Sequence, residues 1–289
     1  MNDFVSVRPA DAAAWITVPT GDTSKYRRGV LGVATGSAAY PGAAVMGVDA
    51  AVHTGLGMVR YVGPDRATDF VLARRPEIVA GVGRVQAWLV GSGISAASLD
   101  ELDATTRDGF AHASEDGVPV VVDAGAIPLV DLGPLAVLTP HAGEAASLLG
   151  VARDEVEGDP QGAALRAAER TGSVVLLKGA DTHVVTPDGG VRLVASSATP
   201  WLAAAGAGDV LGGVLGALVA ARAGTSEVGS EELAHLAAAA AVVHGVAARR
   251  ASRGGPFPMT GLVEQLPGVV RDLAVRGDAQ ADWRTDGLD

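Results

Sequence analysis

Short apolar runs alternate with longer helical segments along most of this chain. The runs within Arg28–Thr35, Val85–Val90 and Ser173–Leu177 are apolar at most positions, without the strict alternation of a strand that has one wet face. Strands of this kind are buried on both faces, as in a parallel sheet covered by helices. The sequence therefore predicts an α/β fold, with a mostly parallel central sheet and helices on both faces. No linker or repeat divides the chain, so we expect a single domain over residues 1–289.

Apolar periodicity and end signals place the expected elements. Residues 1–27 are polar and irregular, and we expect an arm packed on the body; residues 278–289 are expected to be a polar tail. A buried helix is expected after Asp209, because neither proline nor charge interrupts the apolar run before Arg222. The strands are expected at Arg28–Thr35, Met58–Val62, Val85–Val90, Val118–Val122, Leu135–Leu138 and Ser173–Leu177, followed by a hairpin of His183–Thr186 and Val191–Ala195. The other helices are expected at Ala43–Leu56, opened by Pro41 and ended by Gly57, and at Ala67–Arg75, Ser98–Ser114, Ala142–Leu149, Pro160–Arg170 and Glu231–Arg250.

The composition excludes several kinds of site and partner. The chain has no cysteine, which excludes disulfides, thiolate zinc sites, iron–sulfur clusters and cysteine nucleophiles. A net charge of −11 without a basic stripe argues against a nucleic-acid partner. The N-terminus lacks the pattern of a secretory signal, and the longest apolar runs are too short to span a bilayer. We therefore expect a cytoplasmic protein with no membrane contact.

Glycines or polar residues follow most of the expected strands. Ligands bind beyond the C-terminal strand ends in an open α/β sheet, so these residues predict an active site at one sheet edge. The ends are Thr35-Gly36, Gly91-Ser92-Gly93, Asp123, Thr139-Pro140-His141, Lys178-Gly179 and Gly206-Ala207-Gly208-Asp209.

The last of these segments combines a glycine loop with a carboxylate at the start of a helix. Free amides of Gly206, Ala207 and Gly208 at such a helix N-terminus would form an anion hole for a phosphoryl group. Asp209 would then accept a proton from a substrate hydroxyl. The alternative is that Asp209 only caps the helix, which is a common role of aspartate.

The other polar residues also have structural alternatives. His141 can be an ordinary loop histidine, and Glu144 a first-turn acid favoured by the helix dipole. Lys178 ends an apolar run, which favours a role in the site over a surface position. For Asp123, function and turn capping are equally favoured. His53 lies on an apolar helix face, which favours a core or interface role.

Taken together, these residues resemble the ADP/ATP-dependent NAD(P)H-hydrate dehydratases, a family with a ribokinase-like fold. The likeness runs from about Arg28 to Gly245, and its last three motifs are together specific. It is carried by Tyr40-Pro41-Gly42-Ala43, Gly55-Leu56-Gly57-Met58-Val59, Arg75-Pro76-Glu77, Gly91-Ser92-Gly93 (family pattern G-P-G-L-G), Asp123-Ala124-Gly125-Ala126-Ile127 (D-A-D-A-L), Thr139-Pro140-His141-Ala142-Gly143-Glu144 (T-P-H-x-G-E), Leu177–Thr182 (L-K-G-x-x-T) and Pro200–Leu211 (ending G-x-G-D-V-L).

The resemblance implies repair of NADHX or NADPHX, nicotinamide cofactors hydrated on the ring. It implies ADP or ATP as phosphoryl donor, with Mg²⁺ on the nucleotide phosphates. The sequence itself shows no dedicated cage for the metal. Asp209 would be the catalytic base. By motif, the hydrate site would comprise Ala43, Gly93, Asp123, His141 and Asp209, and the nucleotide site would comprise Lys178, Gly179, Ala180, Asp181, Thr182 and Gly208.

The chain departs from the family pattern at several places. Ser92, Ser95 and Gly125 stand where the pattern has proline, glycine and aspartate, which affects expected substrate contacts. Ser196-Ser197-Ala198-Thr199-Pro200 and Ala205 differ from the pattern near the phosphates.

Other activities and partners follow from the same resemblance. The family's epimerase domain would not fit in 27 residues, so an epimerase is expected on a separate chain. The resemblance further implies a homo-oligomer, a tetramer in many members. The nearest alternative function is a small-molecule kinase of the same fold that phosphorylates a vitamin-precursor alcohol, and a nucleotide-binding regulator without turnover is a third.

Overall fold

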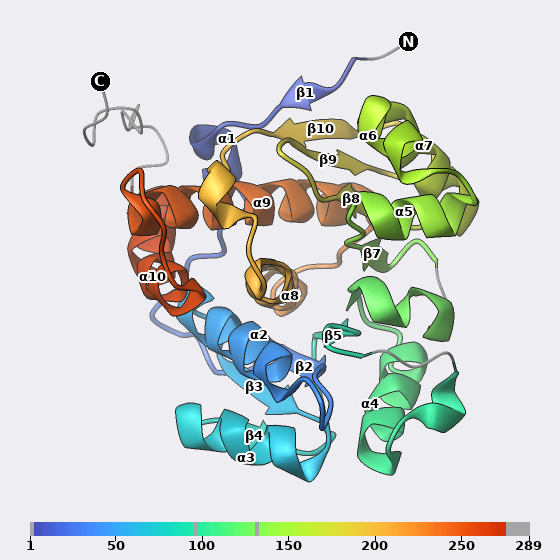
Figure 1. Cartoon of the computed structure of the whole chain (residues 1–289). Helices are drawn as coiled ribbons and strands as arrows, with labels where there is room; N and C mark the ends of the chain where they lie inside the picture. Colours follow the sequence, from blue (N-terminus) through green and yellow to red (C-terminus); the bar gives the residue numbers. More distant parts are fainter. Residues whose placement is uncertain (1–2, 95–97, 131–132, 276–289) are drawn as a thin grey trace.

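One ten-stranded sheet organises the computed structural model, which describes residues 3–94, 98–130 and 133–275 (Figure 1). The strand order is β1-β10-β9-β8-β7-β6-β5-β2-β3-β4. Only β9 runs antiparallel to its neighbours, β8 and β10. The sheet is therefore mostly parallel, as the sequence predicts. Its strands are β1 (Val5–Ser6), β2 (Val30–Ala34), β3 (Met58–Tyr61), β4 (Val79–Ala80), β5 (Ala87–Val90), β6 (Val120–Val122), β7 (Ala136–Leu138), β8 (Val174–Leu177), β9 (Thr182–Val185) and β10 (Arg192–Ala195).

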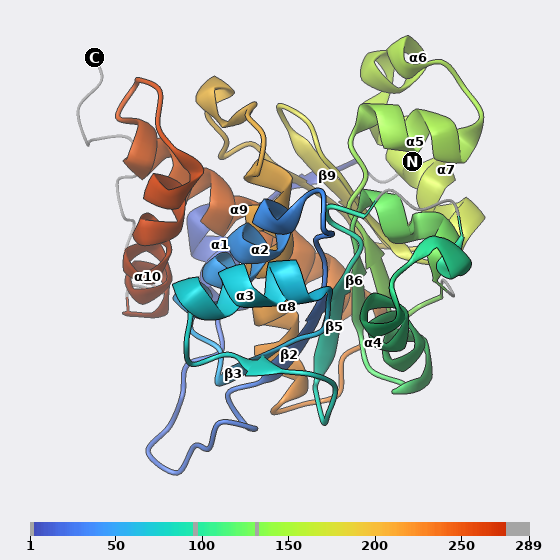
Figure 2. The ribbon, with the colours of Figure 1, turned by 60° about the horizontal axis from the view of Figure 1, so that its bottom comes forward.

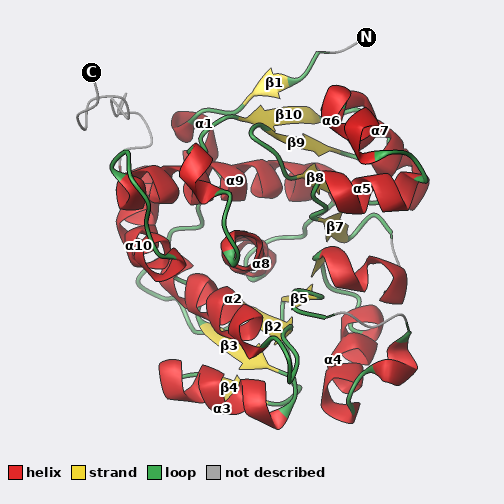
Figure 3. Ribbon diagram, in the orientation of Figure 1, coloured by secondary structure: helices red, strands yellow, loops and turns green. Residues whose placement is uncertain are grey.

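Helices cover both faces of this sheet (Figures 2 and 3). α2, α8 and α9 pack on one face with α10 outside them, and α4, α5 and α7 cover the other. Consecutive strand residues face opposite cores: Leu89 packs with the first group and Trp88 with the second. The helices are α1 (Pro9–Ala13), α2 (Pro41–Thr54), α3 (Asp65–Arg74), α4 (Ala104–Glu115), α5 (Ala142–Leu149), α6 (Arg153–Gly158), α7 (Pro160–Thr171), α8 (Ala207–Ala223), α9 (Ser230–Ser252) and α10 (Met259–Val275), with short 3-10 turns at Leu99–Glu101, Ala124–Leu129 and Pro200–Leu202.

The central helix α8 is buried along most of its length, from Val210 to Ala220. Its glycines let neighbouring backbones approach closely. A Cβ on Gly213 would lie 2.2 Å from the carbonyl oxygen of Gly47 on α2. A side chain there would force the two helices apart, so this contact fixes the position of α2 against α8. The N-termini of both helices belong to the candidate active site.

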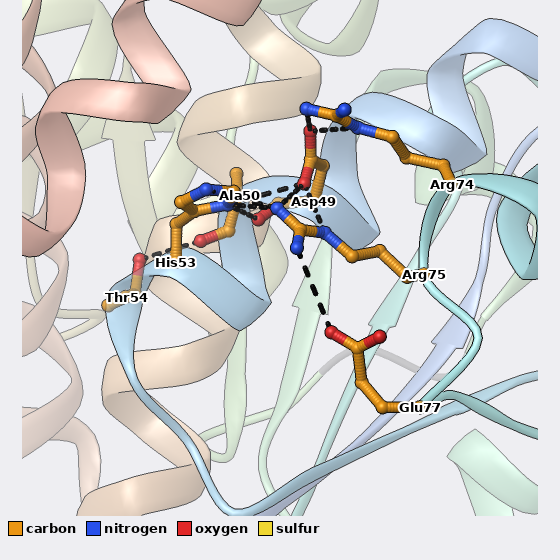
Figure 4. Close-up of polar contacts among 7 residues, drawn as sticks. All are labelled: Asp49, Ala50, His53, Thr54, Arg74, Arg75 and Glu77. Atoms are coloured by element: carbon orange, nitrogen blue, oxygen red, sulfur yellow. Dashed lines mark hydrogen bonds and ion pairs between the residues drawn. The ribbon is translucent and has the colours of Figure 1, made fainter.

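A buried carboxylate ties α2 to the end of α3 (Figure 4). Asp49 is 1% exposed, and Arg74 lies with its Nη2 2.9 Å from Asp49 Oδ2. Arg75 bonds the other carboxylate oxygen, and His53 Nδ1 lies 3.2 Å from it. Burial alone would raise the pKa of Asp49, but the hydrogen bonds from His53, Arg75 and Arg74 outweigh it and lower the pKa to about 2. His53, expected in a core or interface role, thus belongs to this mostly buried clamp.

The N-terminal segment differs from the expected irregular arm. Val5–Ser6 forms β1, which pairs in parallel with β10, and Pro9–Ala13 forms α1. A two-residue strand is too short to show a period in the sequence. The expected tail at 278–289 lies outside the described residues.

Several expected boundaries are also wrong. The helix expected to end at Gly57 ends at Gly55, whose φ of 104° suits the left-handed conformation of a helix C-cap. The helix expected over Ser98–Ser114 begins at Ala104, because the Asp103 carboxylate accepts hydrogen bonds from the amides of Thr105 and Thr106. β4, α6 and α10 were not expected. The other expected strands and helices are present within a few residues of their predicted ends.

Candidate active site

The polar strand ends meet at one edge of the sheet, as expected. β2, β5, β6, β7 and β8 are mutually parallel, so their C-terminal ends share that edge. The start of α8 also lies there, because Ser92 after β5 contacts Asp209 and Gly208 lies near Lys178. Of the predicted residues, the structure brings Asp123, Lys178, Gly208 and Asp209 together.

Asp209 lies in the first turn of α8, but its side chain does not cap the helix. The N-cap is Gly206, with φ 90°, and it has no side-chain cap bond. The Oδ1 atom of Asp209 instead accepts a hydrogen bond from the hydroxyl of Ser92. The carboxylate therefore faces the sheet edge, and the capping alternative does not describe its contact.

The electrostatic surroundings of Asp209 favour a proton acceptor. Burial raises the pKa of Asp209 above its usual value. The hydrogen bond from Ser92 lowers this pKa, the negative charge of Asp123 raises it, and Lys178 lowers it. The net shift is upward, and a carboxylate with a raised pKa is a stronger general base.

Asp123 anchors the lysine of the site. Its Oδ1 atom accepts hydrogen bonds from Thr139 Oγ1 at 2.6 Å and from Lys178 Nζ at 2.8 Å. Asp123 is 6% exposed, so the pair is well shielded from water. The ammonium also lies 4.0 Å from Glu144 Oε2. A Cβ on Gly208 would be 3.5 Å from Nζ, so the lysine is held beside the N-terminus of α8.

The first turn of α8 offers unpaired amides. The first helical bond runs from the amide of Val210 to the carbonyl of Gly206. The amide of Ala207, expected in the anion hole, donates instead to Ala204 at 3.3 Å. Within the described chain, no acceptor is found for the amides of Gly206, Gly208 and Asp209. These three amides and Lys178 together form an electropositive corner suited to phosphate oxygens.

Ala43 and Gly93 form the neighbouring wall. A Cβ on Gly93 would lie 2.6 Å from the Cβ of Ala43, so the loop after β5 touches the start of α2. One turn further along α2, the backbone oxygen of Asp209 lies 3.5 Å from the Cβ position of Gly47. The start of α2 is thus within a helical turn of the Asp209 backbone.

The departure at Gly125 has a steric reason. A Cβ there would lie 2.1 Å from the carbonyl oxygen of Ile94. An aspartate at this position would displace the loop after β5, so this chain requires the glycine. Ser95 lies outside the described residues.

His141 has a clear structural role. It is the N-cap of α5: its Nδ1 accepts from the amide of Glu144 at 3.1 Å, and its own amide donates to Glu144 Oε2 at 2.7 Å. Its Nε2 lies 2.9 Å from Glu144 Oε1, and its side chain is 58% exposed. His141 also bridges to Lys178 through the backbone, since the amide of Lys178 donates to Pro140. The imidazole remains accessible to a ligand from solvent.

The remaining predicted nucleotide residues follow Lys178. Gly179, Ala180 and Asp181 form an exposed turn, and Thr182 begins β9. No hydrogen bond or ion pair joins these residues to Asp209 in the described structure. Their link to Asp123, Gly208 and Asp209 is their chain neighbour Lys178.

The prediction from sequence missed a histidine behind the glycine loop. His244 on α9 is 6% exposed, and its Nε2 has no hydrogen-bond partner among the described residues. Burial lowers the pKa of His244 to about 4, although a hydrogen bond with the backbone of Ala207 acts in the opposite direction and raises it. The imidazole is therefore neutral at physiological pH, and it contacts the backbone at the start of α8. Its signal in the sequence is weak, because it is one of two histidines, with His235, in an apolar, alanine-rich helix.

The acidic residues do not build a metal cage of their own. No group of three or more His, Cys, Asp or Glu side chains in the described ranges could hold a metal ion. Asp123 and Glu144 are already paired with Lys178 and His141. Mg²⁺ commonly binds through one or two carboxylates plus substrate phosphates. The site therefore fits a magnesium ion that arrives on a nucleotide.

Comparisons with known proteins identify the family of this chain. A family model described as NAD(P)H-hydrate dehydratase matches residues 31–260. The chain is 41% identical over 233 residues to the bifunctional NAD(P)H-hydrate repair enzyme Nnr of Mycobacterium leprae, covering 76% of this chain and 47% of that protein. It is 35% identical over 218 residues to the ADP-dependent (S)-NAD(P)H-hydrate dehydratase of Neisseria meningitidis, covering 69% and 72%. The chain thus spans about half the length of the bifunctional relatives it matches.

Solved structures support the same fold. The ADP/ATP-dependent NAD(P)H-hydrate dehydratase of Bacillus subtilis matches with a TM-score of 0.80 at 21% identity, covering 94% of this chain and 99% of that one. A ribokinase-like superfamily protein of Enterococcus faecalis matches with a TM-score of 0.77 at 20% identity, covering 94% and 96%. The fold is ribokinase-like, and no helix of the described residues is long and apolar enough to cross a membrane. Its extensive match to the family model and its likeness to the Neisseria enzyme place this chain in the NAD(P)H-hydrate dehydratase family.

Proposed function

We propose that this protein dehydrates the S form of NADHX or NADPHX at the expense of ADP, restoring NADH or NADPH and releasing AMP and phosphate. The observation that carries the proposal is the half-buried Asp209 carboxylate beside unpaired amides at the start of α8. The names of the relatives supply the substrate class, because the Neisseria relative is an ADP-dependent (S)-NAD(P)H-hydrate dehydratase.

The reaction divides into a phosphoryl transfer and an elimination. Asp209 accepts the proton of the ring hydroxyl as its oxygen bonds to the β-phosphorus of ADP, and the bond from that phosphorus to the bridging oxygen breaks to release AMP. The carbon–oxygen bond of the phosphorylated ring then breaks. Phosphate leaves with the electrons of that bond, and a neighbouring ring carbon gives up a proton to water, which restores the double bond.

The chain's other polar groups hold the nucleotide during transfer. The amides of Gly206, Gly208 and Asp209 donate to oxygens of the transferring phosphoryl group, where negative charge accumulates. Lys178, fixed by Asp123, supplies a positive charge beside them. Mg²⁺ bound to the phosphates would offset further negative charge. Gly179, Ala180, Asp181 and Thr182 would line the adenosine side, and Ala43, Gly93, Asp123 and His141 the hydrate side.

The family match and the curated relatives favour dehydration over the kinase alternative. Both activities would use Asp209 as the base, and they differ in the fate of the phosphate ester. A kinase would release a stable ester, whereas a dehydratase releases inorganic phosphate and a reduced nicotinamide.

The test is turnover of NADHX with ADP, followed by recovery of absorbance at the reduced-nicotinamide band, in the parent protein and in Asp209→Asn. Asparagine keeps the size of the side chain but cannot take a proton, so turnover should fall by roughly 10²–10⁴. ADP affinity should stay the same or improve slightly, because a negative charge near the phosphates is removed.

ADP with Mg²⁺ should also protect both proteins from thermal unfolding, by about 2.7 kcal/mol at a hundredfold excess over its dissociation constant. Absence of NADHX turnover in the parent would refute the dehydratase. Turnover of Asp209→Asn within a few-fold of the parent would remove Asp209 from the mechanism.

The partners are part of the same proposal. An NAD(P)H-hydrate epimerase would work together with this protein in the cytoplasm, and the protein would assemble as a homo-oligomer. The bifunctional names of the mycobacterial relatives support a functional link between two repair activities.

A further inference from the structure

Ser92 stands at a place where the family pattern has no hydroxyl. It follows β5, between Gly91 with φ 106° and Gly93 with φ 69°. The residue is 5% exposed, and its hydroxyl donates to Oδ1 of Asp209, which is far away in the sequence. A proline at this place would carry no donor. The substitution therefore adds a buried contact to the proposed base.

The backbone around Ser92 is held on two sides. Its carbonyl accepts the amide of Gly36 at 2.6 Å, and the amide of Gly91 donates to Ala34 at 3.2 Å. A Cβ on Gly91 would lie 2.2 Å from the backbone oxygen of Asp123, so the loop is tightly packed on its other side. The Ser92 hydroxyl is thus held by a fixed backbone. A water molecule that donated to Asp209 in its place would be free to leave.

The contact leaves half of the Asp209 carboxylate open. Among the described residues, Ser92 is the one hydrogen-bond donor to this carboxylate, and it occupies Oδ1 alone. Oδ2 is therefore available for an incoming hydroxyl. One hydrogen bond restrains the rotation of the carboxylate, and general-base catalysis depends on a well-positioned proton acceptor.

We propose that Ser92 is a positioning residue that holds Asp209 through Oδ1 and presents Oδ2 to the hydroxyl of the substrate. The inference rests on the proposed role of Asp209 as the base. It assigns to this chain a hydroxyl–carboxylate pair that the family pattern, with proline at this place, does not contain.

The same contact affects ionisation of the base. The charged groups that face Asp209 are Asp123 at the end of β6, which raises its pKa, and Lys178 at the end of β8, which lowers it. α2 faces it with the uncharged Gly47. Burial raises the pKa and the Ser92 hydrogen bond lowers it. Loss of the hydroxyl should therefore raise the pKa of Asp209 further, and the acid limb of the activity profile should move to higher pH.

The experiment compares Ser92→Ala, Ser92→Thr and the parent for NADHX dehydration with ADP, with kcat and KM measured from acidic to mildly alkaline pH. In Ser92→Ala we expect kcat to fall about tenfold to a hundredfold, the range for a lost hydrogen bond to a charged group. We expect KM for the hydrate and the ADP-induced thermal shift to be unchanged, and the acid limb to move upward. Ser92→Thr retains the hydroxyl and should keep the parental pH profile.

A double variant separates this proposal from a structural role. Ser92 acts through Asp209, so adding Ser92→Ala to Asp209→Asn should leave the residual turnover unchanged. A kcat of Ser92→Ala within twofold of the parent, an unshifted acid limb, or a full additional loss in the Asp209→Asn background would overturn the positioning role. If Asp209→Asn itself keeps parental turnover, the proposed base is wrong, whatever Ser92→Ala shows. Thermal melting of each variant identifies a folding defect, and in that case Ser92→Cys, a weaker donor of similar size, takes the place of alanine under the same criteria.

Discussion

Replacement of Asp49 by asparagine is expected to weaken the fold in a way that depends on pH. Asp49 is 1% exposed, and Arg74, Arg75 and His53 surround its carboxylate. Removal of the negative charge takes away the buried carboxylate that both guanidinium groups share, although Arg75 keeps Glu77, whose Oε1 lies 3.8 Å from its Nη1. Arg74 is 44% exposed and can regain water, so the loss should lie below the 3–5 kcal/mol typical of a broken, fully buried ion pair.

The pKa shift sets the magnitude. The pKa of Asp49 falls from 3.8 to about 2 on folding. Each unit corresponds to 1.36 kcal/mol, so the ionised carboxylate contributes about 2 kcal/mol to the free energy of unfolding. Because the folded-state pKa is depressed, this contribution is complete above the unfolded-state value and is lost as pH falls through the folded-state value.

The assay is urea unfolding of the parent and Asp49→Asn at neutral pH and at several acidic pH values. The difference in free energy should be about 2 kcal/mol at neutral pH and should shrink between about pH 4 and pH 2. Asp11→Asn is the matched control, because the Arg8–Asp11 pair is exposed and should contribute less than about 1 kcal/mol. A difference for Asp49→Asn no larger than the control's, or one constant down to pH 2, would refute this account of the clamp.

Substitutions at two further positions, His141 and Gly213, test other contacts. His141→Asn keeps an acceptor that can cap α5, whereas His141→Ala should lose about 1 kcal/mol of stability. If the imidazole binds the hydrate, both variants should raise KM for NADHX and leave the ADP-induced thermal shift unchanged. A normal KM in His141→Asn would show that His141 serves only as the helix cap. Gly213→Ala should destabilise the protein by about 1–3 kcal/mol in thermal melts, because its Cβ meets the backbone of Gly47. Gly42→Ala, with no atom within 4 Å of its Cβ, is the control, and equal melting temperatures for both alanine variants would contradict the tight approach of α2 and α8.

Local chemistry made several elements predictable. The helix expected over Ala142–Leu149 is present at those bounds, and the hairpin after Lys178 forms as predicted. Continuous apolar strands and their polar ends also predicted the parallel sheet and the gathering of Asp123, Lys178 and Asp209 at one edge. These features are decided within short segments, where the residue types allow few other secondary structures.

Features that depend on tertiary contacts were not predictable in this way. α10 contains Pro267 in its interior, which the sequence rules interpret as an interruption of a helix. The Ser92–Asp209 bond joins the loop after β5 to the first turn of α8, and the spacing between them depends on how α8 packs on β5. In the sequence, Asp49 is a single acidic residue within a mostly apolar helix, and its arginine partners come from the end of α3 and the residue after it.

The pairing of β1 with β10 has a consequence for protection of the sheet edge. β10 comes late in the chain, so Val5 and Ser6 must wait for most of the chain to be synthesised before they can pair, about ten to forty seconds at usual rates of translation. Until then the outer side of β10 would expose unpaired backbone groups to other chains. Once β1 is in place, the edge of the sheet is a strand of two residues, a length that offers little to an aggregating partner. Val5 and Ser6 would thereby protect the protein from misassembly and would take no part in the reaction.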